Sequence, residues 1–207
     1  MKGVTLIDHP LVRHHLTRLR DARTRPQEFR RILGEVSALM VYEATRSLEA
    51  RRVTVKTPLT AAHGAQLRRE VILVPILRAG LGMLEAILKL VPDASVGFIG
   101  MKREEETLRA TVYYKSLPAD LRRHEIILID PMLATGGSAV AAMDLLRERR
   151  ANRARMVNLL AAPEGVRNFR AHHPEVPIFT AAIDRKLNAK GFIVPGLGDA
   201  GDRSFGL

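Results

Sequence analysis

The residues best suited to chemistry lie in one short segment, Asp130–Ser138, which reads DPMLATGGS. A carboxylate, Asp130, follows an apolar run, and two hydroxyl residues, Thr135 and Ser138, flank a pair of glycines just before a helical pattern begins. The first N–H groups of a helix lack partners and carry the positive end of its dipole, so they attract phosphate. Glycine lets a ligand approach the main chain closely. The segment therefore predicts a site for a ligand that carries both sugar hydroxyls and a phosphate.

The alternative interpretation is a strand-to-helix turn that needs glycine only for its geometry. A glycine pair alone would favour that alternative, because short glycine motifs are weak signals. Asp130, Thr135 and Ser138 in one frame favour the phosphate–sugar site instead.

Two further segments repeat the design of a strand followed by polar residues. Arg78 follows the predicted strand Val71–Leu77 at its carboxyl end, within the segment Val74–Met83, and a guanidinium there can bind phosphate through two hydrogen bonds. Arg103 follows the next strand pattern, beside Lys102 and three glutamates. Each residue also has a non-functional interpretation. Arg78 could form a surface ion pair, and Lys102 could belong to an exposed charge cluster with the glutamates. We prefer the non-functional interpretation for Lys102 but not for Arg78 or Arg103.

The elements that must position these residues alternate along the chain. Strand patterns lie at Val53–Lys56, Val71–Leu77, Ser95–Met101, Ile126–Ile129, Met156–Ala161 and Ile178–Ala182, and helical patterns at Pro26–Leu48, Leu81–Leu90, Ala139–Arg149 and Val166–His172. Thr57–Gln66 reads as a polar connection, and Leu108–Ser116 as part of a hairpin or flap. This alternation predicts an α/β fold, a central, mainly parallel sheet flanked by helices, with ligands at the carboxyl ends of the strands. The 207 residues fit a single domain over 1–207.

Composition narrows the function classes. The chain has no cysteine, which excludes disulfides, a thiolate nucleophile and cysteine-ligated zinc. We expect a cytoplasmic protein, because the N-terminus lacks the apolar core of a signal peptide and the run Val71–Leu77 is too short to cross a bilayer. The seven histidines show no metal-ligand spacing, and we expect residues such as His14, His15, His172 and His173 at the surface or at helix caps.

The net charge of +11 raises the question of nucleic-acid binding. Aromatic residues make up only 4% of the chain, so surfaces on which bases could stack are scarce. The densest basic group is Arg13, Arg18, Arg20, Arg23, Arg25, Arg30 and Arg31. It surrounds a predicted capping box at Thr24 and Gln27, so we expect these arginines to decorate solvated helix faces. A positive field would still attract a polyanionic substrate.

Three motifs carry a family resemblance. Asp130–Ser138 resembles the phosphoribosyl pyrophosphate (PRPP) loop of type I phosphoribosyltransferases, and the single acid before Pro131 matches the uracil branch, whereas most of the superfamily has two. Val74–Met83, VPILRAGLGM, resembles the pyrophosphate loop of that branch. The tail Gly191–Gly206, GFIVPGLGDAGDRSFG, resembles its base-binding segment, with Phe192 where a tyrosine is usual.

The resemblance implies a type I phosphoribosyltransferase fold with a β-hairpin flap and a C-terminal base-binding hood. It implies formation of UMP and diphosphate from uracil and PRPP, with Asp199, Asp130 and Arg78 as catalytic residues. PRPP would contact Arg78, Arg103, Asp130, Pro131, Met132, Leu133, Ala134, Thr135, Gly136, Gly137, Ser138 and Asp199. Uracil would contact Ile193, Gly198, Asp199 and Ala200. We expect Asp202 and Arg203 to form a structural pair.

The resemblance also implies Mg²⁺, held through PRPP and water rather than by a metal site of the protein. It implies a homo-oligomer, dimeric or tetrameric, and a possible GTP effector; neither nucleic acid nor a membrane is an expected partner. Two alternatives stay open. One is an RNA-binding regulator of pyrimidine genes on the same fold, favoured by the basic charge, and the other is an enzyme of this fold that acts on purines.

Overall fold

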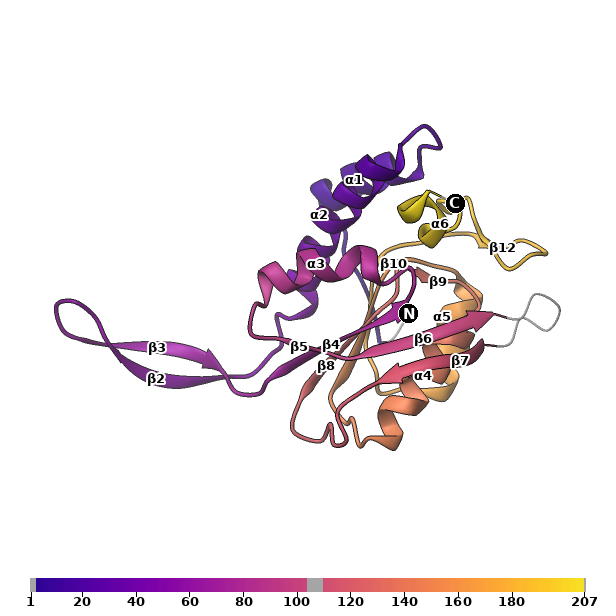
Figure 1. The fold of residues 1–207 in the computed structure, drawn as a ribbon. Helices are drawn as coiled ribbons and strands as arrows, with labels where there is room; N and C mark the ends of the chain where they lie inside the picture. Colours follow the sequence, from indigo (N-terminus) through magenta and orange to yellow (C-terminus); the bar gives the residue numbers. More distant parts are fainter. Residues whose placement is uncertain (1–2, 104–109, 207) are drawn as a thin grey trace.

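A computed structural model of the chain describes residues 3–103 and 110–206. Its centre is a large sheet whose strands follow the order β1-β11-β10-β8-β4-β6-β7, with β5 beside β4 and β9 beside β10 (Figure 1). The strands are β1 (Val4–Leu6), β4 (Val71–Leu77), β5 (Ser95–Val96), β6 (Phe98–Arg103), β7 (Ala110–Ser116), β8 (Glu125–Ile129), β9 (Met132–Leu133), β10 (Ala154–Ala161) and β11 (Ile178–Ile183). Neighbouring strands are parallel except for the antiparallel pair β6–β7. The predicted α/β fold with a mainly parallel sheet is confirmed.

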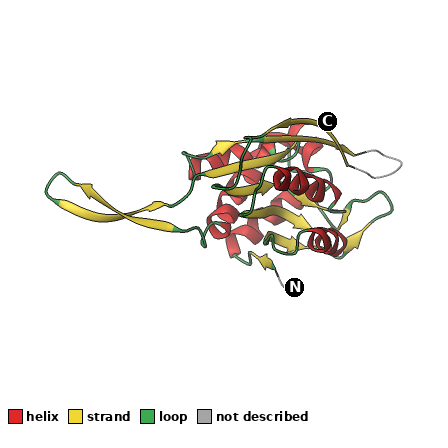
Figure 2. Cartoon of the chain, turned by 90° about the horizontal axis from the view of Figure 1, so that it is seen from below, coloured by secondary structure: helices red, strands yellow, loops and turns green. Residues whose placement is uncertain are grey.

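Helices cover both faces of the sheet (Figures 1 and 2). The helices α1 (Pro10–Arg20), α2 (Pro26–Ala44) and α3 (Leu81–Leu90) bury their apolar side chains in one core, and α4 (Gly137–Glu148) and α5 (Pro163–His172) bury theirs in the other. Side chains of a strand alternate between the two cores, as Ile127 and Leu128 of β8 do. Because both faces are covered, every residue of β8 is buried, which explains its continuous apolar run.

The largest error of the sequence analysis concerns the segment Thr57–Gln66. Most of it is not a connection but strand β3 (Ala61–Leu67), which pairs antiparallel with β2 (Ala50–Lys56) along its whole length. The resulting hairpin projects far from the body of the molecule (Figures 1 and 2). Its residues are exposed on both faces, so the alternation of apolar and polar residues that marks a half-buried strand is missing.

Smaller corrections concern element ends. The strand expected over Ser95–Met101 is interrupted at Gly97, which separates β5 from β6. The helix expected to reach Leu48 ends at Ala44. The capping box is wrong, since Arg25 occupies the N-cap position of α2 and the Thr24 hydroxyl donates to the Arg18 carbonyl at 2.6 Å.

The flap is confirmed where the structure describes it. Strand β7 runs antiparallel to β6, from Ala110↔Arg103 to Ser116↔Phe98. Leu108 and Arg109, the first residues of the predicted flap, lie outside the described residues.

The C-terminal segment forms a small unit over the main sheet (Figure 1). It contains the two-stranded pair β12 (Lys186–Leu187) and β13 (Ile193–Val194), followed by the short helix α6 (Ala200–Phe205). Helix α6 packs mainly against α2, and Ile193, Leu197 and Ala200 join the core that α1, α2 and α3 share. The expected hood therefore exists as a layer over the sheet, in contact with the first helices of the chain.

Candidate active site

The predicted phosphate loop, Asp130–Ser138, follows β8 at the carboxyl edge of the sheet, where the sequence places it. Strand β8 ends at Ile129, the half-buried Asp130 follows, and strand β9 then pairs with the end of β10 before the chain enters α4. The Pro131 carbonyl accepts hydrogen bonds from the N–H groups of Leu159 and Leu160, both at 3.0 Å. These bonds fix the loop against the sheet by its main chain, so the side chain of Asp130 is held at the carboxyl edge of β8.

Helix α4 opens toward this loop. Its N-cap residue, Gly136, has φ +81°, a left-handed conformation that glycine adopts at little cost. Gly136 has no side chain with which to cap the helix, and the Gly137 N–H makes a long bond of 3.4 Å to the Thr135 hydroxyl. The first N–H groups of α4 are thus placed to bind an anion.

Helix α5 supports the loop from behind, which the sequence analysis did not foresee. A Cβ on Gly136 would lie 2.7 Å from the Gly165 carbonyl oxygen, so the loop and α5 touch through their backbones. The Asn168 side-chain amide donates to the Thr135 carbonyl at 2.9 Å. The one available signal was Gly165 itself, a glycine inside a helix that needs a packing reason.

The Arg78 loop, residues 78–80 between β4 and α3, lies directly beside the phosphate loop. A Cβ on Gly80 would come within 2.8 Å of the Ile129 carbonyl oxygen, immediately before Asp130, so only glycine allows this approach. The Leu77–Arg78 peptide bond is cis. The Arg78 side chain is about half exposed, at 56%, and so remains accessible to a ligand.

The C-terminal tail, Gly191–Gly206, lies beside the Arg78 loop. The Arg78 guanidinium lies 3.3 Å from the Asp202 carboxylate, and a Cβ on Gly201 would lie 3.9 Å from Cβ of Ala79. Asp199 is the N-cap of α6, and its carboxylate accepts from the Asp202 N–H at 2.9 Å. The phosphate loop, the Arg78 loop and the tail, although far apart in sequence, therefore meet at one edge of the sheet.

The expected pair of Asp202 and Arg203 is wrong. Asp202 pairs with Arg78, whereas the Arg203 guanidinium donates to main-chain carbonyls, namely those of Leu19, Leu197, Asp21 and Thr24. Burial lowers the pKa of Arg203, and its guanidinium also lies 4.5 Å from the centre of the Phe29 ring. Arg203 thus ties the tail to the α1–α2 connection.

The expectation that the N-terminal arginines only decorate helix faces is also wrong in part. Arg30 donates to the Ser204 carbonyl at 2.6 Å, and Arg20 binds Asp184 and Gly196. Arg23, in contrast, is exposed and pairs with Asp21, and this pair lowers the pKa of Asp21 to about 2. Part of the basic group therefore holds the tail, and part lies in solvent.

The structure places Arg103 only in part. It is the last residue of β6, paired with Ala110, but its side chain lies outside the described residues, as do the three glutamates after it. Lys102 is exposed, as expected. The proximity of Arg103 to the other loops therefore stays a prediction.

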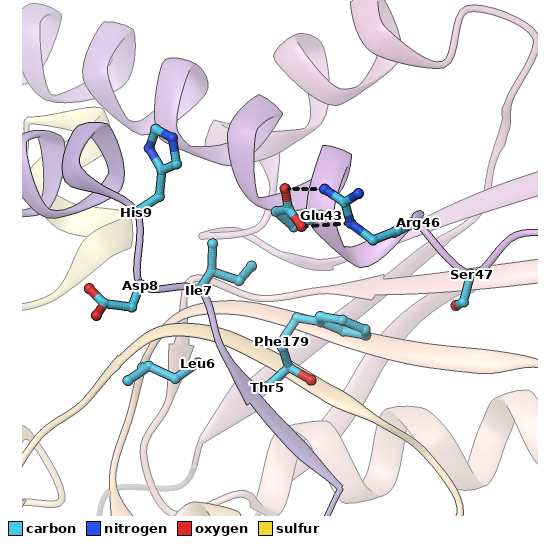
Figure 3. Close-up of a pocket in the computed structure, with 9 residues that line it drawn as sticks. All are labelled: Thr5, Leu6, Ile7, Asp8, His9, Glu43, Arg46, Ser47 and Phe179. Carbon is cyan, nitrogen blue, oxygen red and sulfur yellow. Dashed lines mark hydrogen bonds and ion pairs between the residues drawn. The ribbon is translucent and has the colours of Figure 1, made fainter.

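A separate cavity of about 490 Å³ opens at the sheet edge formed by β1 (Figure 3). Apolar side chains such as Phe179 line it together with the ion pair of Glu43 and Arg46, whose Nη2–Oε1 distance is 2.8 Å. None of its lining residues belongs to the three loops. The predicted site is an open edge of the sheet, and this cavity is distinct from it.

Of the four histidines named above, two lie at the surface as expected, and the other two are partly or fully buried. His14 and His172 are exposed and His15 is partly buried, but His173, the cap residue after α5, is 5% exposed and lies 3.2 Å from the Asp144 carboxylate.

Within residues 3–103 and 110–206, histidines and acids form no group of three that could hold a metal ion. In the same residues, no helix is both long and apolar enough to span a membrane.

Comparison with known proteins identifies the family. A family model described as uracil phosphoribosyltransferase matches residues 6–207. The chain belongs to the uracil phosphoribosyltransferase family. The uracil phosphoribosyltransferase of Rhizobium etli is 55% identical over 207 residues, which cover 100% of this chain and 99% of the relative.

Solved structures agree on the fold of this family member. The AQ2163 protein of Aquifex aeolicus superposes with a TM-score of 0.95 at 38% identity, over 99% of this chain and 98% of that one. The adenine phosphoribosyltransferase of Trypanosoma brucei superposes with a TM-score of 0.60 at 13% identity, over 92% and 88% of the two chains. The latter likeness concerns the fold alone, and it confirms the predicted type I phosphoribosyltransferase fold.

Proposed function

We propose that this chain transfers the 5-phosphoribosyl group of PRPP to N1 of uracil and so forms UMP and diphosphate. In this reaction the bond between the ribose anomeric carbon and the diphosphate oxygen breaks, and a bond from that carbon to uracil N1 forms. The proton of N1 leaves, and diphosphate departs with the bonding electrons. The meeting of the phosphate loop, the Arg78 loop and the tail supports the proposal, together with family membership over nearly the full length.

Each loop has a proposed role at PRPP. Asp130 would accept hydrogen bonds from the ribose hydroxyls, and the main chain of Ala134–Ser138 would bind the 5′-phosphate at the start of α4. Arg78, with Arg103 from the end of β6, would bind the diphosphate and neutralise the charge that grows as it leaves. Pro131, Met132 and Leu133 would act through the backbone that fixes Asp130, since Pro131 and Leu133 are buried.

The tail has the proposed role of reading the base. The main chain of Ile193 and of Gly198–Ala200 would match the C=O, N–H and C=O groups along one edge of uracil. Cytosine presents a donor where O4 of uracil would be, and would leave buried groups unpaired at ~1–3 kcal/mol each. Asp199 would face the ribose and assist the loss of the N1 proton. Its position beside Asp202 and Arg78 supports the first of these roles.

We propose Mg²⁺ as the cofactor, bound through PRPP and water. The donors at the site fit this mode, because Asp130 is a single carboxylate and Mg²⁺ commonly keeps several waters while it binds substrate phosphates. When bound, the cation would neutralise negative charge on the diphosphate.

We propose that the chain forms one domain that assembles into a homo-oligomer. The β2–β3 hairpin supports this proposal, because an isolated two-stranded hairpin is marginally stable in water and this one projects with Leu59 at its tip 96% exposed. A second copy would cover it. Light scattering tests the proposal, which fails if the chain is monomeric at micromolar concentration.

Control by GTP and a cytoplasmic location stay predictions.

One assay tests the proposed function. Purified protein is incubated with PRPP, Mg²⁺ and uracil, and parallel reactions contain cytosine, hypoxanthine or orotate instead. We expect UMP from uracil and little product from the other three bases. Product from hypoxanthine at a comparable rate would contradict the proposal and favour the purine alternative.

A further inference from the structure

Two charged side chains hold the middle of the base-reading tail. The two terminal nitrogens of Arg20 donate to the two carboxylate oxygens of Asp184, each at 2.7 Å. Arg20 also donates to the Gly196 carbonyl at 2.8 Å, and the Gly196 N–H donates to Asp184 at 2.8 Å. The pair thus binds both backbone groups of one residue, Gly196.

The ion pair of Arg20 and Asp184 is largely shielded from water. Asp184 directly follows β11, and its side chain is 7% exposed; Arg20 ends α1, and its side chain is 25% exposed. Burial alone would raise the pKa of Asp184, but the Arg20 guanidinium and the Gly196 N–H outweigh that effect, and the pKa lies below its usual value. The hydrogen bonds are therefore charge-assisted, which makes them shorter and stronger than neutral ones.

The position of Gly196 affects the backbone of the residues before and after it. It has φ +62°, and its Cα packs so closely on the Ile193 carbonyl that a Cβ there would overlap the oxygen. Gly198 follows two residues later. A shift of Gly196 therefore moves the Ile193 carbonyl and the chain that leads to Gly198.

We propose that Arg20 and Asp184 are positioning residues for uracil: by holding Gly196, they keep the main chain of Ile193 and of Gly198–Ala200 at the spacing that the edge of the base requires. The inference rests on the proposed uracil-binding role of those residues. Arg203 and Arg30 have a different role, because they bind the carbonyls of Leu197 and Ser204 and hold α6.

The decisive measurement is the KM for each substrate separately. In Arg20→Met and Asp184→Asn, we expect the KM for uracil to rise about ten- to a hundred-fold, as loss of a charged hydrogen bond predicts. The KM for PRPP should change less than about two-fold, because this pair binds the tail at Gly196, whereas Arg78 pairs with Asp202. A role in global folding alone would lower the melting temperature without separating the two KM values.

The chain offers a matched control pair. Arg122 and Asp120 also form an arginine–aspartate ion pair, but on an exposed loop, where Nη2 and Nε of Arg122 donate to Oδ2 of Asp120 at 2.8 and 3.0 Å. We expect Arg122→Met and Asp120→Asn to leave both KM values unchanged. The double variant Arg20→Met/Asp184→Asn should raise the KM for uracil no further than the more severe single variant, because the pair acts as a unit.

Conservative replacement supplies a second test. Arg20→Lys keeps the charge but has a single donor group, so it cannot bind Asp184 and the Gly196 carbonyl in the same forked geometry, and we expect an intermediate KM for uracil. If Arg20→Met does not fold, Arg20→Lys decides. An unchanged KM for uracil in the folded variants, or equal rises in both KM values, would overturn the inference alone. Absence of UMP formation by the wild-type protein would overturn the proposed function and this inference with it.

Discussion

In the proposed function, the phosphate loop and the tail each hold a backbone at a fixed position against a ligand, and they do so in different ways. The phosphate loop does so with local means, since a buried strand precedes it, a helix follows it, and a left-handed Gly136 joins the two. The tail has only the short pair β12–β13 and the six-residue helix α6, and it depends on arginines from the other end of the chain. A loop between a strand and a helix is held by its neighbours in sequence, whereas a segment with little regular structure needs partners that are distant in sequence.

The largest effect is expected at the phosphate loop. Asp130→Asn preserves the shape of the side chain but removes the charge that would bind the ribose hydroxyls. We expect kcat/KM for PRPP to fall about a hundred-fold, with the fold retained. Steady-state kinetics and circular dichroism measure the two quantities. Asp93→Asn, at an exposed loop position, is the control, and near-wild-type kinetics for Asp130→Asn would rule out the ribose role.

An effect of similar size separates two glycines with the same backbone conformation. In Gly136→Ala, the methyl group would be strained at φ +81° and would meet the Gly165 carbonyl at 2.7 Å, so we expect a loss of about 2–4 kcal/mol in the free energy of unfolding. In Gly198→Ala, φ is +82° but the nearest atom is Arg203 Cδ at 3.5 Å, and we expect about 1–2 kcal/mol. Denaturant unfolding measures both. Equal losses would mean that close packing adds nothing at Gly136.

A third prediction concerns the tie between the tail and the first helices. Arg203→Met keeps much of the side-chain volume beside Phe29 but leaves the carbonyls of Leu19, Leu197 and Asp21 without this donor. We expect a loss of about 1–3 kcal/mol in the free energy of unfolding. Arg46→Met, which removes an exposed ion pair with Glu43, should change it by less than about 0.5 kcal/mol. An Arg203→Met variant as stable as Arg46→Met would show that the tie is unimportant for stability.

The smallest effect is a pH dependence of the tail. The lowered pKa of Asp184 means that the folded state binds this proton less readily than the unfolded state does. Its stabilisation is therefore complete above the unfolded-state pKa of about 4 and is lost as the pH falls through the lower folded-state pKa. The stability difference between wild type and Asp184→Asn should shrink in acid below about pH 4. A difference that stays constant from pH 6 to pH 3 would contradict this assignment.

The same contrast explains what the sequence could predict. The strands β4 and β8 and the helix α3 carry strong local patterns and were predicted closely, as were the phosphate loop and the position of Arg78. The hairpin strand β3 was missed because its exposed residues show no periodicity. The ties of Arg20 and Arg203 to the tail could not be foreseen, because an arginine that binds a carbonyl some 180 residues away has the same local sequence as one in solvent.

The contact between Gly80 and the Ile129 carbonyl has a consequence for anyone who would redesign this enzyme. With no space for even a methyl group between them, the phosphate loop and the Arg78 loop move as one block. An insertion in either loop must displace the other, so the proposed binding of the sugar and of the diphosphate cannot be altered independently. The tail approaches the block less closely at Gly201, where a Cβ would still lie 3.9 Å from Ala79. Selection for a new base should therefore succeed by exchanging the tail together with its arginine supports.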